Sequence, residues 1–322
     1  MGGTDLLILT HRKAQEVDGV IDAVRAHGHS VERINLCQYP EDAAYSWSAS
    51  NVGYLSQVGT TKVGWFHNPG RYSISRTLEG HGREIALREC DGFWEGIGLS
   101  IQCEWLNHPQ SLVLSSRKLS QIAIAKRLDI AVPDTLVSNS PTEVAEFFSV
   151  HQGAVAKSIA NGYSVYGEEH IKLYSRYFER LPNDLADGLR LSPMIFQKYI
   201  RKQNELRVTC IDGECFGLIA DTTDLGDEKI DIRQLNYQDE RARFRGAGVP
   251  DDVMRSSLQL LDHFKLSYAG LDWIQGPDGE WYFLEMNAMG SFKWSEIQGA
   301  GDITTALTKA ILQRIEARFA SS

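Results

Sequence analysis

Apolar and polar positions alternate in blocks along the first third of the chain. The short continuous apolar run at 5–10 is typical of a buried parallel strand, and further strands are predicted at 30–36 and 62–68. The segments 14–27 and 82–98 have helical spacing. Because strands alternate with helices, the pattern predicts an open α/β unit. No GxGxxG motif follows the first strand, so this unit is not expected to bind a dinucleotide at its first turn.

A second block of elements begins near residue 115 with the amphipathic helical pattern of "SRKLSQIAIAKRLDI". A further helix is predicted after Ser140, which stands at an N-cap position, with Pro141 at the first helical position. Strands are predicted at 154–160, 170–175 and 193–200.

The last block contains two hairpins, each with the strong turn signal Asp-Gly. They span 205–220 and 270–287, and helices are predicted at 250–265 and 302–319. The chain as a whole is therefore predicted to have a mixed α/β (α+β) fold.

The second hairpin places three oxygen-bearing side chains together. With Asp278-Gly279 as a two-residue loop, Asp272 lies directly opposite Glu285, and Asn287 points to the same face. Two carboxylates this close repel each other unless one is protonated or a cation lies between them. Three hard oxygen ligands on one face are suited to Mg²⁺ or Mn²⁺, with nucleotide phosphates completing the coordination shell.

A second interpretation is that Asp272 and Glu285 are edge charges that face water and that Asn287 is a turn residue. The predicted register also requires a hairpin without a β-bulge. Pro277 weakens that requirement, because proline has no N–H to donate beside the loop. Both interpretations stay open at this point.

Positive charge for a phosphate site is available from two lysines. The Walker motif GxxxxGK[ST] is absent. Lys157, however, lies in the apolar strand "AVAKSIA", where a lysine is costly unless it meets an anion, and Lys118 opens the helix of the same block. The polar loop after Lys157 contains Gly162 and Gly167, whose backbone N–H groups suit phosphates. The alternative is that these lysines are simply solvated.

The order of these motifs resembles that of the ATP-grasp superfamily of carboxylate–amine ligases. In chain order the motifs are Lys118, "AVAKS", "FQKYI", "ELRV", "GLDW" and "YFLEMNAMGSF", and the resemblance covers essentially the whole chain. It implies an ATP-grasp fold preceded by an N-terminal α/β domain. The implied domains are 1–114 for the N-terminal domain, 115–192 for the small half of the grasp and 193–322 for the large half with the metal site.

The resemblance also implies roles for individual residues. Asp272, Glu285 and Asn287 match the Mg²⁺-binding pattern of the superfamily. Lys118 and Lys157 are implied to bind the phosphates of ATP.

Adenine and the transferred phosphoryl group have implied partners too. Glu205 is implied to lie near the ribose, and Arg207 to steady the phosphoryl group and the resulting acyl phosphate. Arg233, in "DIRQ", is a candidate for a second contact to the acyl phosphate or to the acceptor carboxylate. The strand implied to recognise adenine through its backbone consists of Gln197, Lys198, Tyr199 and Ile200.

Three stretches are most similar to the ligases that cyclise ribosomal peptides, the microviridin or graspetide type. They are "WLNHPQSLVLSSRKLSQIAIAKRLDIAVPDTLVSNSP", "DIRQLNYQ" and "NAMGSFKWSEIQGAGDITTALTKAIL". This resemblance implies that ATP, with Mg²⁺ or Mn²⁺, activates Asp or Glu side chains of a precursor peptide for attack by Ser/Thr hydroxyls or Lys amines. It also implies a homodimer. Ala288 departs from the commoner Asn-Pro-x-Gly pattern, in which proline stands at this position.

A basic loop precedes the helix at 250–265. In "RARFRGAG" the arginines are spaced by two, which is typical of a solvated loop. The alternative hypothesis is that the loop lies at the substrate entrance and helps to hold an acidic core peptide. The arginines are Arg241, Arg243 and Arg245.

Composition narrows the class of protein. The formal net charge of −9 argues against a nucleic-acid or anionic-membrane partner, and no apolar run is long enough to span a membrane. The N-terminus has neither a signal-peptide pattern nor a myristoylation pattern. Five cysteines at irregular spacing suit a reducing cytosol, so a cytoplasmic protein is expected. Cys210 and Cys215 are expected to face each other across the first hairpin as free thiols.

Three other functions fit parts of the pattern. A ligase for small amino acids, or one that adds residues to a protein terminus, would carry the same motifs. A nucleotide-binding sensor without turnover is opposed by the intact set of carboxylates and lysines. A plain phosphotransferase is the last alternative, because a metal site does not determine the acceptor.

Overall fold

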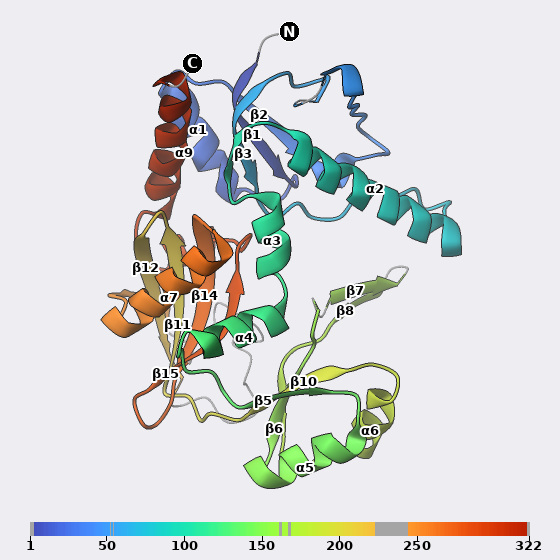
Figure 1. The fold of residues 1–322 in the computed structure, drawn as a ribbon, viewed down its shortest axis with the longest axis vertical. Coiled ribbons are helices and arrows are strands. Elements are labelled where there is room, and N and C mark those ends of the chain that lie inside the picture. Colours follow the sequence, from blue (N-terminus) through green and yellow to red (C-terminus); the bar gives the residue numbers. More distant parts are fainter. Residues whose placement is uncertain are drawn as a thin grey trace.

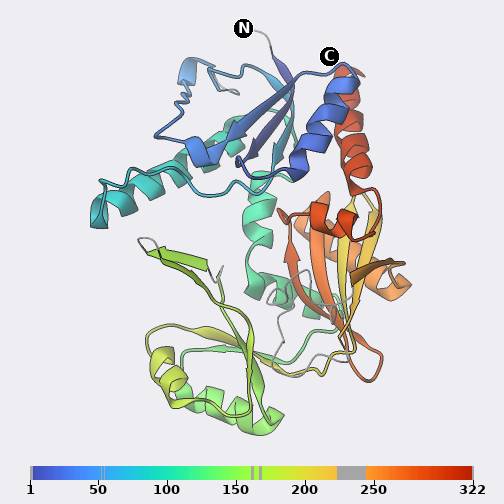
Figure 2. The same ribbon diagram turned by 180° about the vertical axis from the view of Figure 1, so that it is seen from behind.

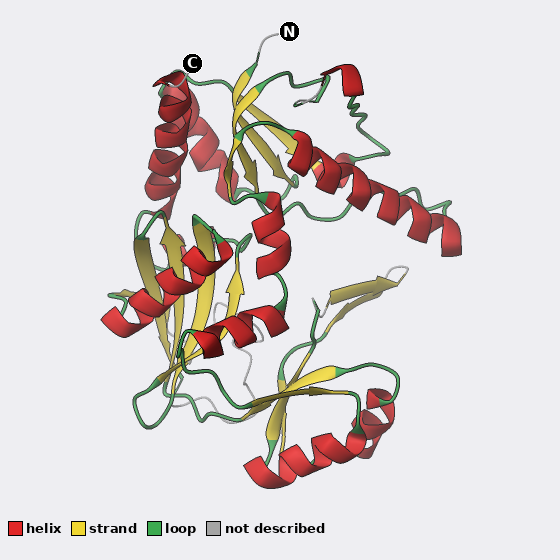
Figure 3. Ribbon diagram, in the orientation of Figure 1, coloured by secondary structure: helices red, strands yellow, loops and turns green. Residues whose placement is uncertain are grey.

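A computed structural model gives the fold of most of the 322-residue chain (Figure 1). In the part that the structure describes, the strands form three main sheets and one separate two-stranded ribbon, and the helices pack around them (Figure 3). None of the helices in this part of the chain is long and apolar enough to cross a membrane. The structure describes residues 3–51, 53, 55–160, 163–166, 169–222 and 244–320.

The first sheet is parallel, as the alternating pattern predicts. Its strands run in the order β2-β1-β3-β4, and helices cover both faces (Figures 1 and 2). Two 3₁₀ turns, η1 (Leu36–Gln38) and η2 (Ala49–Asn51), follow β2. The strands are β1 (Thr4–Thr10), β2 (Val31–Asn35), β3 (Thr61–Phe66) and β4 (Glu104–Leu106), and the helices are α1 (Glu16–Ala26), α2 (Gly80–Ser100) and α9 (Ile303–Ala320).

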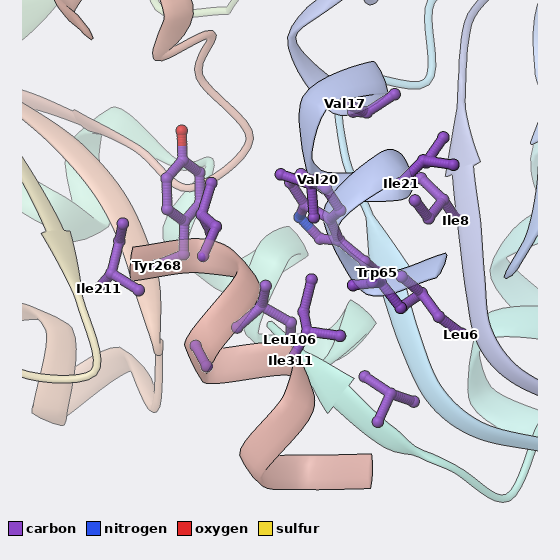
Figure 4. Packing of buried hydrophobic residues seen from close by; sticks show 14 of the residues in the cluster. Leu6, Ile8, Val17, Val20, Ile21, Trp65, Leu106, Ile211, Tyr268 and Ile311 are labelled. Atoms are coloured by element: carbon purple, nitrogen blue, oxygen red, sulfur yellow. The ribbon is translucent and has the colours of Figure 1, made fainter. Parts of the chain in front are cut away.

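Helix α9 comes from the far end of the sequence but packs against α1 and the first sheet (Figure 1). Its apolar face joins a core that extends into the third sheet. In this core Ile311 of α9 and Leu106 of β4 lie near Ile211 and Tyr268 of the third sheet (Figure 4). The first unit and the last unit therefore share one hydrophobic core, which buries large side chains from both.

The second sheet is small and antiparallel, in the order β5-β10-β6-β9. Two short helices, α3 (Pro109–Ser115) and α4 (Lys118–Arg127), lead into it. The predicted helix start is confirmed, because Ser140 Oγ accepts a hydrogen bond from Glu143 N and Pro141 begins α5. The other elements are β5 (Thr135–Ser138), α5 (Pro141–His151), β6 (Ala154–Lys157), β9 (Arg176–Phe178), α6 (Asn183–Leu189) and β10 (Met194–Lys198), with β7 (Tyr163–Tyr166) and β8 (Glu169–Lys172) forming the ribbon.

The third sheet is antiparallel and has the order β13-β12-β11-β14-β15. Helices α4 and α7 pack on one face of it, and α9 packs on the other. Its elements are β11 (Asn204–Ile211), β12 (Glu214–Asp221), β13 (Phe244–Ala247), α7 (Asp251–Phe264), β14 (Tyr268–Gln275), β15 (Trp281–Asn287) and α8 (Lys293–Ile297).

The first hairpin of this sheet forms as predicted. Asp212 and Gly213 make the two-residue loop, and both have the positive φ angles, 45° and 91°, that the favoured hairpin turn requires. Cys210 lies opposite Cys215, and both are free thiols with their Sγ atoms 2.8 Å apart.

The second hairpin corrects the predicted loop but keeps the predicted pair. Gly276 N donates to Glu280 O at 2.9 Å, so three residues, 277–279, form the loop, and Gln275 faces Trp281. The predicted two-residue loop, which would pair Gln275 with Tyr282, is therefore wrong. A register shift beyond Asp272 then restores the pair Asp272–Glu285. A loop beginning at a proline avoids the N–H that a two-residue loop would need, and the bulge compensates for the extra loop residue.

Protonating Asp5 is expected to destabilise the first sheet. Its carboxylate accepts hydrogen bonds from Lys62 Nζ at 2.7 Å and from Ser30 N at 2.9 Å. Burial alone would raise the pKa of Asp5, but Lys62 and Ser30 outweigh it and lower the pKa to about 2. Because the folded chain has the lower pKa, this stabilisation is complete above about pH 4 and is lost as the pH falls toward about 2.

Urea unfolding of the natural chain and of Asp5→Asn tests this. The difference in free energy of unfolding should be on the order of 1 kcal/mol near neutral pH and should shrink below about pH 4. A difference that stays constant down to the lowest pH at which the chain folds would contradict the assignment.

Candidate active site

One cavity, of about 920 Å³, lies among the second sheet, the third sheet, α3 and α4. Asn68, which follows β3 in the first unit, also lines the cavity. Every described residue to which the family resemblance assigns a site role lines this cavity, although these residues come from seven separate strands, helices and loops, whereas Arg245 of the basic loop does not line it. They are Lys118, Lys157, Gln197, Lys198, Tyr199, Ile200, Glu205, Arg207, Asp272, Glu285 and Asn287. Their individual roles stay predictions.

The three candidate metal ligands lie in the part of the β14–β15 hairpin that is farther from its loop. Asp272 and Glu285 are cross-strand partners, and Asn287 follows on the same strand as Glu285. Asn287 is exposed, while Glu285 is half-buried. Within the part of the chain that the structure describes, no group of three His, Cys, Asp or Glu side chains is placed to hold a metal. A metal here would therefore have two carboxylates and an amide oxygen as its protein ligands, a hard donor set that fits Mg²⁺.

Arg207 lies beside the carboxylates rather than alone in the cavity. Strand β11 pairs with β14 so that Arg207 is next to Asp272, and its Nη1 donates to both carboxylate oxygens at 2.9 Å. Burial alone would lower the pKa of Arg207, but Asp272 and Glu285 raise it, so the guanidinium stays charged. Two carboxylates can thus lie close together here because a buried cation offsets part of their repulsion.

The guanidinium of Arg207 fits only because glycines flank it. A Cβ on Gly270 would lie 2.1 Å from Nη2, and one on Gly290 would lie 2.7 Å from the same atom. Both distances are far shorter than van der Waals contact. The glycine in "YAGLDW" and the glycine after Asn287 therefore make room for this side chain.

Gly270→Ala is expected to displace the guanidinium and lower the free energy of unfolding by about 1–3 kcal/mol, the usual cost of overpacking. Gly188→Ala in α6 is the matched control, because a Cβ there meets nothing within 4 Å. Urea denaturation of both variants measures the difference. Equal unfolding free energies for the two variants would mean that Arg207 is free to move away.

Helix α4 sets the position of Lys118. Its Nζ donates to Ser158 O at 3.0 Å and lies 3.8 Å from a carboxylate oxygen of Glu285. One turn later, Gln121 is fully engaged with β15: its Nε2 donates to Met286 O at 2.8 Å, and its Oε1 accepts from Met286 N at 2.8 Å. The amide of Gln121 therefore acts as an extra strand partner and fixes the distance between α4 and Glu285.

Lys157 is the last residue of β6 and lies in register with Ile195 of β10. It is half-buried, and the residues after it, 158–160, continue along the cavity wall. Lys118 hydrogen bonds to Ser158, so the two lysines enter the cavity from adjoining segments. Together with Arg207 they bring three cationic side chains to the cavity, two of them beside the carboxylates of Asp272 and Glu285. Cationic side chains suit phosphates.

The segment implied to recognise adenine, 197–200, covers the end of β10 in the second sheet and the start of the connection to β11 in the third sheet. The side chain of Gln197 is buried and donates to Thr135 Oγ1 at 3.0 Å, so it stabilises the strand. Lys198 is exposed, and Tyr199 packs against Tyr177 with ring centroids 4.7 Å apart. Glu205 forms an ion pair with Lys202.

Several predicted residues fall outside the described part of the chain. Arg233 is among them, as are the glycines and arginines of two predicted loops. Arg245 is described and is exposed on β13. The predicted residues outside the described ranges are Gly162, Gly167, Arg233, Arg241 and Arg243.

Sequence reasoning missed part of the cavity wall. Asn68 follows β3, has a φ of 43°, and reaches the cavity from the first unit. Its position at the carboxyl end of a parallel strand was a usable signal, since ligands commonly bind at that edge. Phe244 and Trp294 also line the cavity, packed edge to face with ring centroids 5.6 Å apart. Their contact joins β13 to α8, and no local sequence signal predicts it.

No protein-family model matches the chain, and none of the curated proteins compared matches it. Solved structures do. One is a RiPP-associated ATP-grasp ligase of Chryseobacterium gregarium in complex with ADP, and a leader and core peptide: it is 24% identical, 97% of each chain is covered, and the TM-score is 0.83. Another is the macrocyclase MdnC of Microcystis aeruginosa bound with the precursor peptide MdnA, 23% identical, with 96% of this chain and 99% of that chain covered and a TM-score of 0.80.

A more distant likeness is to the D-cycloserine synthetase DcsG, which is 15% identical, with 96% of this chain and 99% of that chain covered and a TM-score of 0.62. The likeness to these ligases extends over nearly the whole chain. The protein therefore has the ATP-grasp fold, in agreement with the fold expected from its motifs.

Proposed function

We propose that this protein is an ATP-dependent peptide macrocyclase. It would convert Asp or Glu side chains of a ribosomal precursor peptide to acyl phosphates and join them to Ser/Thr hydroxyls or Lys amines. The observation that carries the proposal is the cavity, in which a hard oxygen donor set lies beside lysine and arginine side chains within the ATP-grasp fold. Likeness to a ligase in complex with leader and core peptides favours a peptide as the substrate.

The cationic side chains beside the carboxylates support the assignment of ATP phosphates. Lys118 and Lys157 would hold the phosphates, and Arg207 would stabilise the phosphoryl group during transfer. Asp272 accepts two hydrogen bonds from Arg207, and these would hold its carboxylate in place beside the group that binds the transferred phosphoryl. Mg²⁺, when bound, neutralises charge that develops on the phosphate oxygens.

The remaining groups would orient the two substrates. The backbone of 197–200 and Glu205 would bind the adenosine part of ATP, and Arg233 would contact the acyl phosphate. Asp272, Glu285 and Asn287 would bind Mg²⁺ or Mn²⁺. Free thiols and the acidic net charge favour a cytosolic protein without nucleic-acid or membrane partners. A homodimer is proposed by analogy with related ligases.

Incubation with ATP, Mg²⁺ and a paired precursor peptide, followed by mass spectrometry of the peptide, tests this function. Each ester or amide bond removes one water, so the peptide should lose about 18 Da per bond while one ADP forms. Fragmentation then locates the linked side chains.

Two other outcomes would redirect the assignment. If the peptide is unchanged while ADP forms with free amino acids, the protein is a ligase for small amino acids. If ATP is not consumed with any peptide or amino acid, the proposed enzyme function is wrong and a nucleotide-binding role replaces it.

A further inference from the structure

Two aromatic side chains line the cavity, and neither has a role in the assignments above. They are Phe244 of β13 and Trp294 of α8, which pack edge to face with ring centroids 5.6 Å apart. Both residues of this aromatic pair are only half-buried, although large aromatic side chains stabilise a fold most when they are buried completely. An apolar surface that the folded chain leaves open inside a binding cavity is typical of a ligand contact.

The strand register separates the aromatic pair from the candidate metal ligands. One row of paired residues crosses the five strands of the third sheet, and it consists of Gly246, Leu218, Arg207, Asp272 and Glu285. Phe244 precedes Gly246 by two residues, so its side chain points to the same face of the sheet as that of Arg207. Arg207 therefore lies between the carboxylates on β14 and β15 and the aromatic pair at β13.

Groups proposed to bind the nucleotide adjoin β14 and β15. Lys118 Nζ lies 3.8 Å from a carboxylate oxygen of Glu285. At the other end of this hairpin, a Cβ on Gly276 would lie 3.3 Å from Ile200 Cγ2, and Gln203 N donates to Gln275 O at 2.8 Å. ATP would thus occupy the side of Arg207 on which β14 and β15 lie, and the peptide would approach from the side of β12 and β13.

The wall that carries the aromatic pair is rigid. Glu296 Oε2 accepts hydrogen bonds from Thr304 N and Thr304 Oγ1, both at 2.7 Å, so α8 is held against the start of α9. Gly299, which follows α8, lies so close to β13 that a Cβ on Gly246 would be 1.8 Å from Gly299 O. The two rings therefore project from backbones that touch each other, and a surface of this kind loses little conformational freedom when a ligand binds.

We propose that Trp294 and Phe244 form a subsite for an apolar side chain of the precursor peptide, next to the Asp or Glu that is activated. This inference rests on the proposed function and names a feature of its substrate. The activated carboxylate must reach the phosphoryl group beside Arg207, so its neighbours in the peptide lie over the aromatic pair. An apolar neighbour buries its surface against the two rings, whereas a polar neighbour loses water there without gaining a partner. The aromatic pair thus helps to select which carboxylate is activated.

Two versions of a paired precursor peptide, with Leu or with Ser beside the linked carboxylate, test the subsite. Calorimetry in the presence of ADP and Mg²⁺ measures their affinities. The natural protein should bind the leucine version about 10-fold more tightly, as expected for burial of one leucine side chain. Trp294→Ala should bind the leucine version about 10-fold more weakly and the serine version almost unchanged, so that the preference disappears. Trp294→Phe keeps an aromatic ring and should retain most of the preference.

Binding of ADP shows whether each variant is folded, and it should be the same in all of them. Trp47→Ala is the matched control, because Trp47 is exposed and does not line the cavity. It should keep the natural preference for the leucine version.

Three results would overturn the subsite and leave the macrocyclase proposal intact. They are equal binding of both versions by the natural protein, a preference that persists in Trp294→Ala, and weaker ADP binding in Trp294→Ala with natural peptide binding. The last result would assign the rings to the nucleotide. A natural protein that forms no dehydrated peptide would overturn both proposals.

Discussion

Replacing Glu285 with glutamine is expected to lower peptide dehydration by about a thousandfold or more. Glu285 is the cross-strand partner of Asp272 and lies 3.8 Å from Lys118 Nζ, so its charge faces both the proposed metal and the proposed phosphates. Glutamine keeps the shape of the side chain and removes only the charge. The loss should therefore come from weaker metal binding and not from disturbed packing.

Nucleotide binding separates these two causes. In the natural protein, Mg²⁺ should strengthen ADP binding in calorimetric titrations, and in Glu285→Gln this dependence on Mg²⁺ should largely disappear. Glu280→Gln is the control, because Glu280 lies on the same hairpin but is exposed beside the loop. Full activity in Glu285→Gln, or an equal loss in Glu280→Gln, would contradict the metal assignment.

Replacing Asn107 with alanine is expected to lower the free energy of unfolding by about 4 kcal/mol. Its amide makes four hydrogen bonds, three of them buried and the one from Ser267 partly buried: Nδ2 donates to Tyr268 O and Ala288 O, and Oδ1 accepts from Ser267 N and Tyr268 N. Alanine would leave these backbone groups without partners and would also have to adopt the positive φ of 55°.

Urea denaturation, with Asn183→Ala as the control, measures this effect. Asn183 is exposed at the start of α6, so its replacement should change stability by less than about 0.5 kcal/mol. Asn107 links the end of β4 to β14 and to the segment after Asn287. A loss below about 1 kcal/mol in Asn107→Ala would mean that water replaces these bonds and that the link is not a structural requirement.

Local patterns predicted much of the fold, because strands, helix starts and hairpin turns depend on neighbouring residues. The parallel first sheet, the Ser140 helix start and the Asp212-Gly213 turn formed as expected. The loop at Pro277 did not, although the pair Asp272–Glu285 still formed. The loop is one residue longer than predicted, and the bulge shifts the strand register by one residue in the opposite sense, so the pair is kept. Neither the longer loop nor the bulge has an unambiguous local signal.

Contacts between distant segments were beyond local reasoning. The ion pair between Arg207 and Asp272 depends on β11 lying next to β14, which a hairpin pattern cannot specify. The packing of α9 on the first sheet and the hydrogen bonds between Gln121 and Met286 are of the same kind. These contacts depend on the order of strands and the path of the chain, which local patterns of residues do not specify.

Transfer of oxygen from the substrate carboxylate to phosphate shows directly whether the carboxylate is activated by phosphorylation. A precursor peptide whose Asp and Glu carboxylates carry ¹⁸O is incubated with ATP and Mg²⁺, and the released phosphate is analysed by mass spectrometry. Attack on an acyl phosphate breaks the carbon–oxygen bond, so one ¹⁸O is expected in phosphate for each bond formed. Phosphate without ¹⁸O, alongside dehydrated peptide, would contradict activation of the carboxylate by phosphorylation.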